Sequence, residues 1–175
     1  MELFKNGYVV AKLNGNDKAY EAWPLADLPN DKIAQALTDR ADNEWFCKYD
    51  MQHIVPDLDY ARIYLNYCKS IKLPVKMLLF ESLDSMITIN DEVRIEEFMG
   101  FDCIATVYYS YLQSEKNEFK ADLLSKNIHL NEYGLANSIE DVFEFIKIRK
   151  EVIASGVNLE DFWKEIPVKI SVVET

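Results

Sequence analysis

The amino-acid sequence predicts one α+β domain over residues 1–175, built from an antiparallel or mixed sheet and about four to five helices. Apolar residues make up 49% of the chain and aromatic residues 13%, which is enough for a substantial core. A chain of this length needs only one such core. Strand-like and helix-like hydrophobic periods both occur, but they do not alternate in a regular βα repeat. That mixture favours α+β over a doubly wound parallel sheet.

The N-terminal segment is expected to form a β-hairpin. Residues 8–13 are rich in strand-forming side chains, and Asn14-Gly15 is a strong turn signal. Residues 18–23 can then form the returning strand. A longer loop over residues 14–17 would also connect the two strands, so the sequence leaves their register open.

Two helices and a strand are expected next. Asn30 is expected to cap a short helix. The apolar stripe of that helix consists of Ile33, Ala36 and Leu37. Residues 39–56 show no clear hydrophobic period. A second helix is expected to begin after Pro56 and to end at Pro74. Residues 75–80 then form an almost continuous apolar run, which is typical of a buried central strand.

The middle of the chain carries mixed signals. Alternating apolar and charged residues over 91–99 predict a strand, which would form a hairpin with residues 86–89 across an Asn90-Asp91 turn. A helix over residues 91–99 is the alternative. Apolar spacings of three and four over residues 104–114 predict a third helix. A further short helix is expected over residues 119–125.

The clearest helix is predicted over residues 139–154. Ser138 and Asp141 resemble a capping box, with Asp in place of the usual Glu. A short helix is expected over residues 158–163. Alternating apolar residues then predict a terminal strand that contains Val168, Ile170 and Val172. Pro167 is expected to place that strand at a sheet edge or to stand at its first residue.

The chain is strongly acidic. Its 30 Asp and Glu residues exceed its 19 Lys and Arg residues, which gives a formal net charge of −11 and a pI near 4.6. Such a charge attracts cationic partners and repels nucleic acids and anionic membranes. The sequence shows no signal-peptide pattern and no apolar run near the ~20 residues of a membrane span. We therefore expect a cytoplasmic protein that binds neither nucleic acid nor membrane.

Motifs for catalysis, cofactors and metals are missing from the sequence. Nucleophile-elbow, phosphate-loop, dinucleotide-binding and calcium-loop patterns do not occur. Cys47, Cys68 and Cys103 lack the spacing of a zinc site, and we interpret them as packed, reduced thiols. His53 and His129 stand in ordinary settings, without a nucleophile pattern beside them. We therefore expect a protein that is not an enzyme and that holds no cofactor or metal.

The strongest functional signal is a stretch of acidic residues. Residues 81–102 contain seven acidic residues and Arg94 as the one basic residue, a local excess of six negative charges. Three tyrosines follow closely, and tyrosine is common at interface hot spots. An acidic surface with aromatic anchors suits a basic protein partner. The candidate binding residues are Asp91, Glu92, Glu96, Glu97, Asp102, Tyr108, Tyr109 and Tyr111. The alternative is a solvated face beside a tyrosine-rich core helix.

Three segments in this region resemble a known class of proteins. They are Glu97-Phe98-Met99-Gly100-Phe101-Asp102, Tyr108-Tyr109-Ser110 and Leu130-Asn131-Glu132-Tyr133-Gly134-Leu135. Together, over roughly residues 95–150, the chain resembles small acidic bacterial immunity proteins of contact-dependent or polymorphic toxin systems. The resemblance implies a cytosolic antitoxin without enzymatic activity. Such a protein neutralises its cognate toxin domain, often a basic nuclease, by blocking the active site or the path of the substrate.

Two other functions remain open from the sequence. An acidic mimic of nucleic acid would inhibit a DNA-handling protein, and it would compete against several unrelated DNA-binding proteins. A carboxylate-dependent enzyme, with or without a divalent metal, would have one carboxyl group with a pKa above about 6.

Overall fold

The computed structural model describes residues 2–13, 20–46, 54–85, 87–105, 110–156 and 164–175. Within these ranges the protein has the predicted α+β fold, with an antiparallel five-stranded sheet in the order β2-β1-β3-β5-β4. The strands are β1 (Phe4–Lys12), β2 (Glu21–Ala22), β3 (Val75–Ser82), β4 (Ile95–Ala105) and β5 (Glu165–Val173). The α-helices are α1 (Lys32–Ala41), α2 (Leu58–Ser70), α3 (Tyr111–Glu115), α4 (Lys120–Ser125) and α5 (Ile139–Ala154). A 3-10 turn at Leu25–Asp27 and a π-helical turn at Asp42–Phe46 flank α1.

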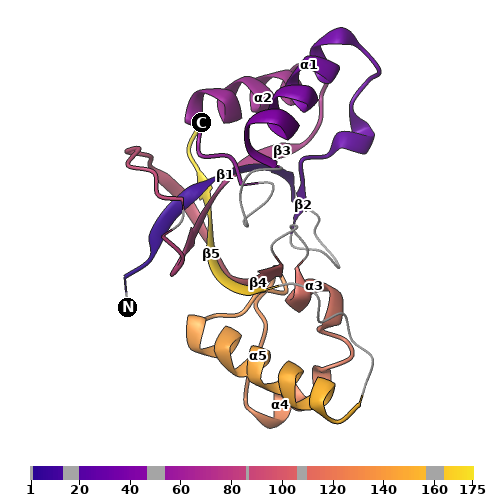
Figure 1. Ribbon diagram of the computed structural model, residues 1–175, viewed down its shortest axis with the longest axis vertical. Helices are drawn as coiled ribbons and strands as arrows, with labels where there is room; N and C mark the ends of the chain where they lie inside the picture. The colour runs from indigo at the N-terminus through magenta and orange to yellow at the C-terminus, as the bar shows by residue number, and fades with distance from the viewer. Residues whose placement is uncertain (1, 14–19, 47–53, 86, 106–109, 157–163) are drawn as a thin grey trace.

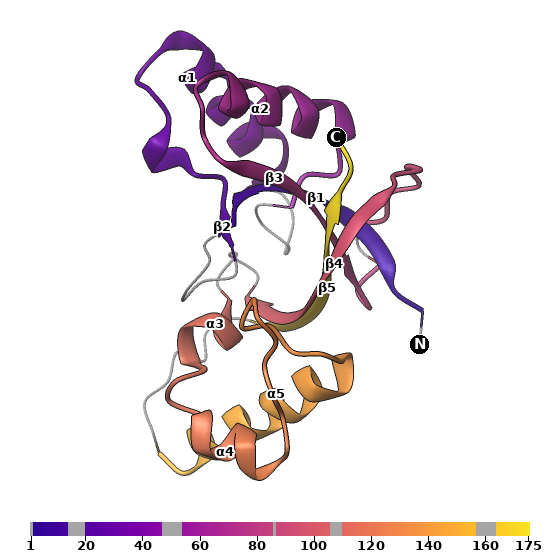
Figure 2. The ribbon, with the colours of Figure 1, turned by 180° about the vertical axis from the view of Figure 1, so that it is seen from behind.

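The helices form two groups at opposite ends of a curved sheet (Figure 1). At one end α1 and α2 lie together, and α2 contacts β1 and β3. At the other end α3, α4 and α5 lie together, where α3 contacts β4 and α5 contacts both β4 and β5 (Figure 2). The buried side chains form two clusters that follow this division. The sheet therefore connects two groups of helices, and β4 extends from one cluster into the other.

Several elements confirm the sequence-based predictions. The N-terminal hairpin forms, with β1 and β2 paired in the register Ala11↔Ala22 and Lys12↔Glu21. The apolar run after Pro74 is the central strand β3, which pairs with β1 on one side and with β5 on the other. Residues 77–80 of β3 are all buried.

Helices α2 and α5, which come before and after β3 along the chain, also confirm the predictions. An acidic or hydroxyl side chain caps the first turn of each. In α2 the Asp57 carboxylate accepts a hydrogen bond from the Tyr60 N–H at 2.8 Å. In α5 the Ser138 hydroxyl accepts from the Asp141 N–H at 3.1 Å. The predicted short helix near residue 120 is α4.

Helix α1 begins one residue later than predicted, and its buried face also differs from the predicted apolar stripe. Asp31, not Asn30, is the capping residue, because its carboxylate accepts hydrogen bonds from the N–H groups of Ile33 and Ala34. The helix buries Ala34, Leu37 and Ala41. Of the expected stripe only Leu37 is buried: Ile33 is 59% exposed, and Ala36 is exposed as well.

The second predicted hairpin is wrong. Residues 87–94 form no strand, and β4 pairs with β5 about seventy residues away along the chain instead of with a local neighbour. The segment before β4 crosses β1: the Ile89 N–H donates to the Lys5 carbonyl at 2.9 Å, and the Asn6 side chain donates to the Ile87 carbonyl at 2.8 Å. Tertiary contacts with β1 therefore override the local turn signal.

The predicted helix over residues 104–114 is also wrong in extent. Ile104 and Ala105 end β4, whereas the helix there is α3, which begins after its capping residue Ser110. The apolar residues over 104–114 are spaced by three and four because the buried end of a strand and a short buried helix follow one another in this segment. The predicted helix over residues 158–163 lies outside the described residues.

The terminal strand β5 forms as predicted, but it is not an edge strand, because it lies between β3 and β4. Pro167 is the third residue of β5 and pairs with Cys103 of β4. Pairing between β5 and β3 begins only at Val168. Proline is tolerated at this point because β5 has a strand neighbour on one side only.

Candidate protein-binding surface

Most of the candidate acidic residues lie on or just before β4, which is an edge strand of the described sheet. Residues 131–136 cover the free edge of its C-terminal half. Phe101 and Ala136 exchange two main-chain hydrogen bonds of 2.9 Å. The Asn131 side chain donates to the Met99 carbonyl at 2.7 Å. This part of the edge is therefore not open to another strand.

A glycine permits this close approach. Gly100 has φ of +143°, a conformation that side-chain-bearing residues rarely adopt. A Cβ atom at this position would lie 2.8 Å from the Cβ of Leu135 and 2.9 Å from the carbonyl oxygen of Ala136. The position therefore requires glycine both for its backbone conformation and for space.

The N-terminal end of β4 differs from the rest of the strand. Its residues Ile95–Phe98, which we call the β4 tip, are all exposed and pair only with β5 among the described residues. Ile95 is 41% exposed and Phe98 is 47% exposed, and the two glutamates lie between them. Successive side chains of a strand point to opposite faces, so both faces of the sheet are open to solvent here. Sequence reasoning selected Glu96 and Glu97 but missed their two apolar neighbours.

Lysines from distant parts of the chain reduce the charge of the acidic stretch 81–102. The ion pairs are Lys76–Glu96 at 2.9 Å, Lys164–Asp84 at 2.9 Å and Lys169–Glu81 at 2.6 Å. They lower the local excess from six negative charges to three. A count along the sequence overestimates the local field, because it omits residues that the fold brings near. The Lys76–Glu96 pair is nearly half exposed on both sides and is therefore weak.

The remaining acidic side chains of this stretch differ in their partners. The Tyr133 hydroxyl donates to the Glu97 carboxylate, and this hydrogen bond, with burial and the nearby negative charge, raises the pKa of Tyr133 to about 12. The Tyr8 hydroxyl donates to Asp91 at 3.1 Å. Glu92 is exposed and forms no ion pair with any residue that the structure describes. Asp91, Glu92, Glu96 and Glu97 thus lie along one continuous stretch that leads into and through the β4 tip.

Asp102 belongs to the interior and not to this surface. It is fully buried, and its Oδ1 accepts hydrogen bonds from the Cys103 N–H and the Ser110 hydroxyl, each at 2.8 Å. Its Oδ2 accepts from the Tyr20 hydroxyl at 2.7 Å. Burial raises the pKa of Asp102 to about 7, although the hydrogen bonds from Ser110 and Cys103 and the charge of Lys116 act in the opposite direction. A partner protein cannot contact this carboxyl group unless the fold opens.

Tyr111 also belongs to the interior. It is fully buried, and the guanidinium of Arg149 lies over its ring, 4.0 Å from the centroid. Arg149 is itself fully buried on α5. It donates to Glu115 of α3 at 2.8 Å and to Glu165 of β5 at 3.0 Å. This network, which sequence reasoning missed, connects two helices to the sheet.

Two of the candidate binding residues, Tyr108 and Tyr109, lie outside the described residues, as do Cys47 and His53. Cys68 and Cys103 are buried free thiols, and burial raises the pKa of Cys68 to about 11. Within the described ranges, no three His, Cys, Asp or Glu side chains are grouped as a metal site would require. No described helix has the length and apolar character needed to cross a membrane.

Comparison with known proteins gives no match to a family model, to a curated protein or to a solved structure. The resemblance to immunity proteins therefore stays a prediction from the sequence.

Proposed function

We propose that this protein is a non-enzymatic inhibitor that binds a basic protein, as bacterial immunity proteins bind their toxins, and that the β4 tip contributes to the binding surface. The observation that carries the proposal is the composition of the tip. Two large apolar side chains and two carboxylates are exposed next to one another at the edge of a sheet. Exposed strand edges that carry apolar side chains are sites where another chain can pair.

The two kinds of side chain have different roles in this proposal. Glu92, Glu96 and Glu97 attract a positively charged partner and raise the association rate. Ile95 and Phe98 lose their exposed apolar surface in the complex and slow dissociation. The partner is a basic toxin domain, and the bound inhibitor blocks its active site or the path of its substrate.

Affinity capture from the native host tests this proposal with matched variants. The double substitution Glu96→Lys and Glu97→Lys reverses two charges at the β4 tip. The control, Glu118→Lys with Glu151→Lys, makes the same charge change at two exposed residues outside the β4 tip. Wild type and control should retain a stoichiometric basic protein, identified by mass spectrometry, and the tip variant should lose most of it. Equal capture by both variants would remove the β4 tip from the interface.

The captured protein also separates inhibition from nucleic-acid mimicry. A dedicated inhibitor should suppress the activity of one basic partner and leave unrelated DNA-binding proteins unaffected. Competition against several unrelated DNA-binding proteins would instead support an acidic mimic.

One observation bears on the enzyme alternative. That alternative requires a carboxyl group with a pKa above about 6, and Asp102 fulfils this requirement. However, three donors already occupy its two oxygens, and the side chain is fully buried. This arrangement supports a structural role. Asp102→Asn should therefore leave capture of the basic partner unchanged, whereas loss of capture by a folded variant would place Asp102 at the interface.

A further inference from the structure

A second surface, far from the β4 tip, has the opposite character. A cavity of about 230 Å³ lies beside α4. The residues that line it are Lys116, Asn117, Lys120, Leu123, Leu124, Ile128, His129 and Leu130. None of them is acidic, although acidic residues outnumber basic ones in the protein by 30 to 19. The acidic residues of the same segment, Glu118 and Asp122, are exposed and do not line the cavity.

The chain forms this cavity by reversing direction after α4. The Ile128 N–H donates to the Leu123 carbonyl at 2.9 Å, and the Asn127 N–H donates to the Leu124 carbonyl at 3.0 Å. Asn127 has φ of +58°, the left-handed conformation that ends many helices in this way. Residues 128–130 therefore return alongside α4, and the cavity opens between the two segments.

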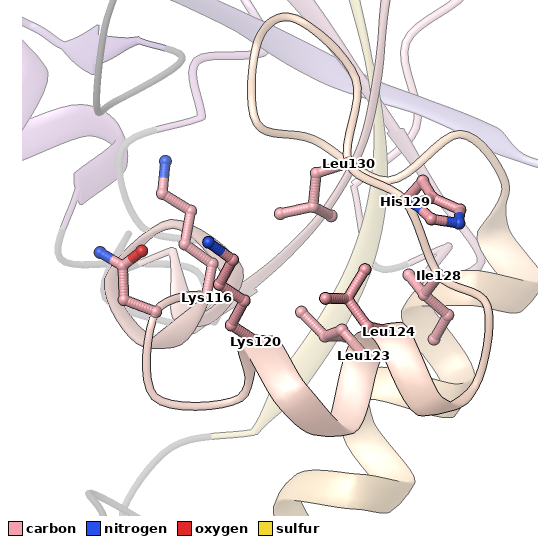
Figure 3. A pocket seen from close by; sticks show the side chains of 8 residues that line it. Lys116, Lys120, Leu123, Leu124, Ile128, His129 and Leu130 are labelled. Carbon is pink, nitrogen blue, oxygen red and sulfur yellow. The ribbon is translucent and has the colours of Figure 1, made fainter.

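The lining combines an apolar centre with polar ends. Figure 3 shows Leu123, Leu124 and Leu130 between Lys120 on one side and His129 on the other. Leu123 is buried, whereas Leu124 is 51% exposed. Lys120 is exposed and forms no ion pair with a residue that the structure describes.

From this lining we infer that the α4 cavity binds a small amphiphilic anion: a carboxylate that carries a short hydrocarbon chain or ring. The apolar part contacts Leu123, Leu124 and Leu130, and the carboxylate lies near the ammonium group of Lys120. Size limits the ligand, because a cavity of ~150 Å³ holds benzene and drug-sized molecules need roughly 300 Å³ or more. A ligand of about six to ten carbon atoms fits between these limits. This site is independent of the proposed inhibitor function.

Octanoate and octylammonium provide the test, because they share a hydrocarbon chain and differ in the sign of the charge. Titration of the full-length protein should show saturable octanoate binding, with a dissociation constant on the order of millimolar for so small a ligand. The NMR methyl signals of Leu123, Leu124 and Ile128 should shift during the titration. Octylammonium should bind more weakly. Equal binding of the two probes, or no saturable binding of octanoate, would overturn the inference.

Two lysine variants locate the charge that matters. Lys120→Met removes the ammonium group at the cavity and should weaken octanoate binding about two- to fivefold, as expected for an exposed ion pair. Lys126→Met is the matched control, because Lys126 follows the same helix but pairs with Glu144 at 3.4 Å and does not line the cavity. It should change the dissociation constant less than Lys120→Met does. Equal weakening by both variants would contradict a carboxylate at Lys120.

Discussion

The buried carboxyl group of Asp102 should make the stability of the protein depend on pH in an unusual direction. Its folded-state pKa of about 7 lies roughly three units above the value of 3.8 for a free Asp side chain. The folded state holds the proton of Asp102 more tightly than the unfolded state does, so the bound proton stabilises the fold. This stabilisation is complete below about pH 4 and is lost as the pH rises to about 7. At about 1.4 kcal/mol per unit, the full effect is about 4 kcal/mol. Asp102→Asn removes the titrating group and keeps the shape of the side chain.

Urea unfolding of wild type and Asp102→Asn between pH 4 and pH 8 measures this effect. All other groups titrate in both proteins, so the difference between their free energies of unfolding isolates Asp102. The variant should gain stability relative to wild type as the pH rises from 4 to about 7, by up to about 4 kcal/mol, and the difference should level off near pH 8, where Asp102 is ionised in both the folded and the unfolded state. A difference that does not depend on pH, or one that changes in favour of wild type as the pH rises, would refute a raised pKa at Asp102.

Three further predictions test other parts of the structure. Arg149→Met should lower the free energy of unfolding by about 3–5 kcal/mol, because it removes the arginine from the buried Glu115 carboxylate and leaves Glu165, among the described residues, only its ion pair with the exposed Lys150. The neighbouring substitution Lys150→Met should cost less than about 1 kcal/mol. Chemical denaturation measures both, and similar losses would contradict the buried network. Gly100→Ala should destabilise the protein more than Gly156→Ala. Both glycines have positive φ, but a Cβ at Gly156 meets no atom within 4 Å, whereas a Cβ at Gly100 meets several. Equal shifts of the melting temperature would show that steric contact at Gly100 is unimportant. Phe98→Ser should raise the dissociation rate of the captured partner about tenfold with little change in the association rate. Surface plasmon resonance measures both rates, and an unchanged dissociation rate would exclude Phe98 as an anchor.

Sequence patterns predicted the elements whose signals are local. The β1–β2 hairpin, α2 and α5 each carry their own turn or capping residues, and β3 is buried on both faces, so its apolar run is continuous. The strand β4 was harder to predict for a physical reason. One end of β4 is exposed and the other is buried, so apolar and polar residues do not alternate in one pattern along the strand. Its partner β5 is also distant along the chain.

The candidate site was predicted only in part, for similar reasons. The charged residues before and within the β4 tip were found from the sequence, but the lysines that pair with them come from other strands and segments. Asp102 and Arg149 carried a signal that was available. Asp102 is the one charged residue in the run Phe101–Ala105, and Arg149 stands four residues after Phe145 and seven after Val142, on the buried face of α5. A charged residue at a core position of its own element is expected to be buried with partners.

Hydrogen–deuterium exchange on the complex with the captured partner tests the central claim most directly. If the β4 tip is part of the interface, the amides of residues 95–98 should exchange more slowly in the complex than in the free protein. Residues 139–154 of α5, on the other side of the molecule, should exchange at the same rate in both. Protection confined to α5 or to the α1–α2 end, with unchanged exchange at residues 95–98, would contradict binding at the β4 tip.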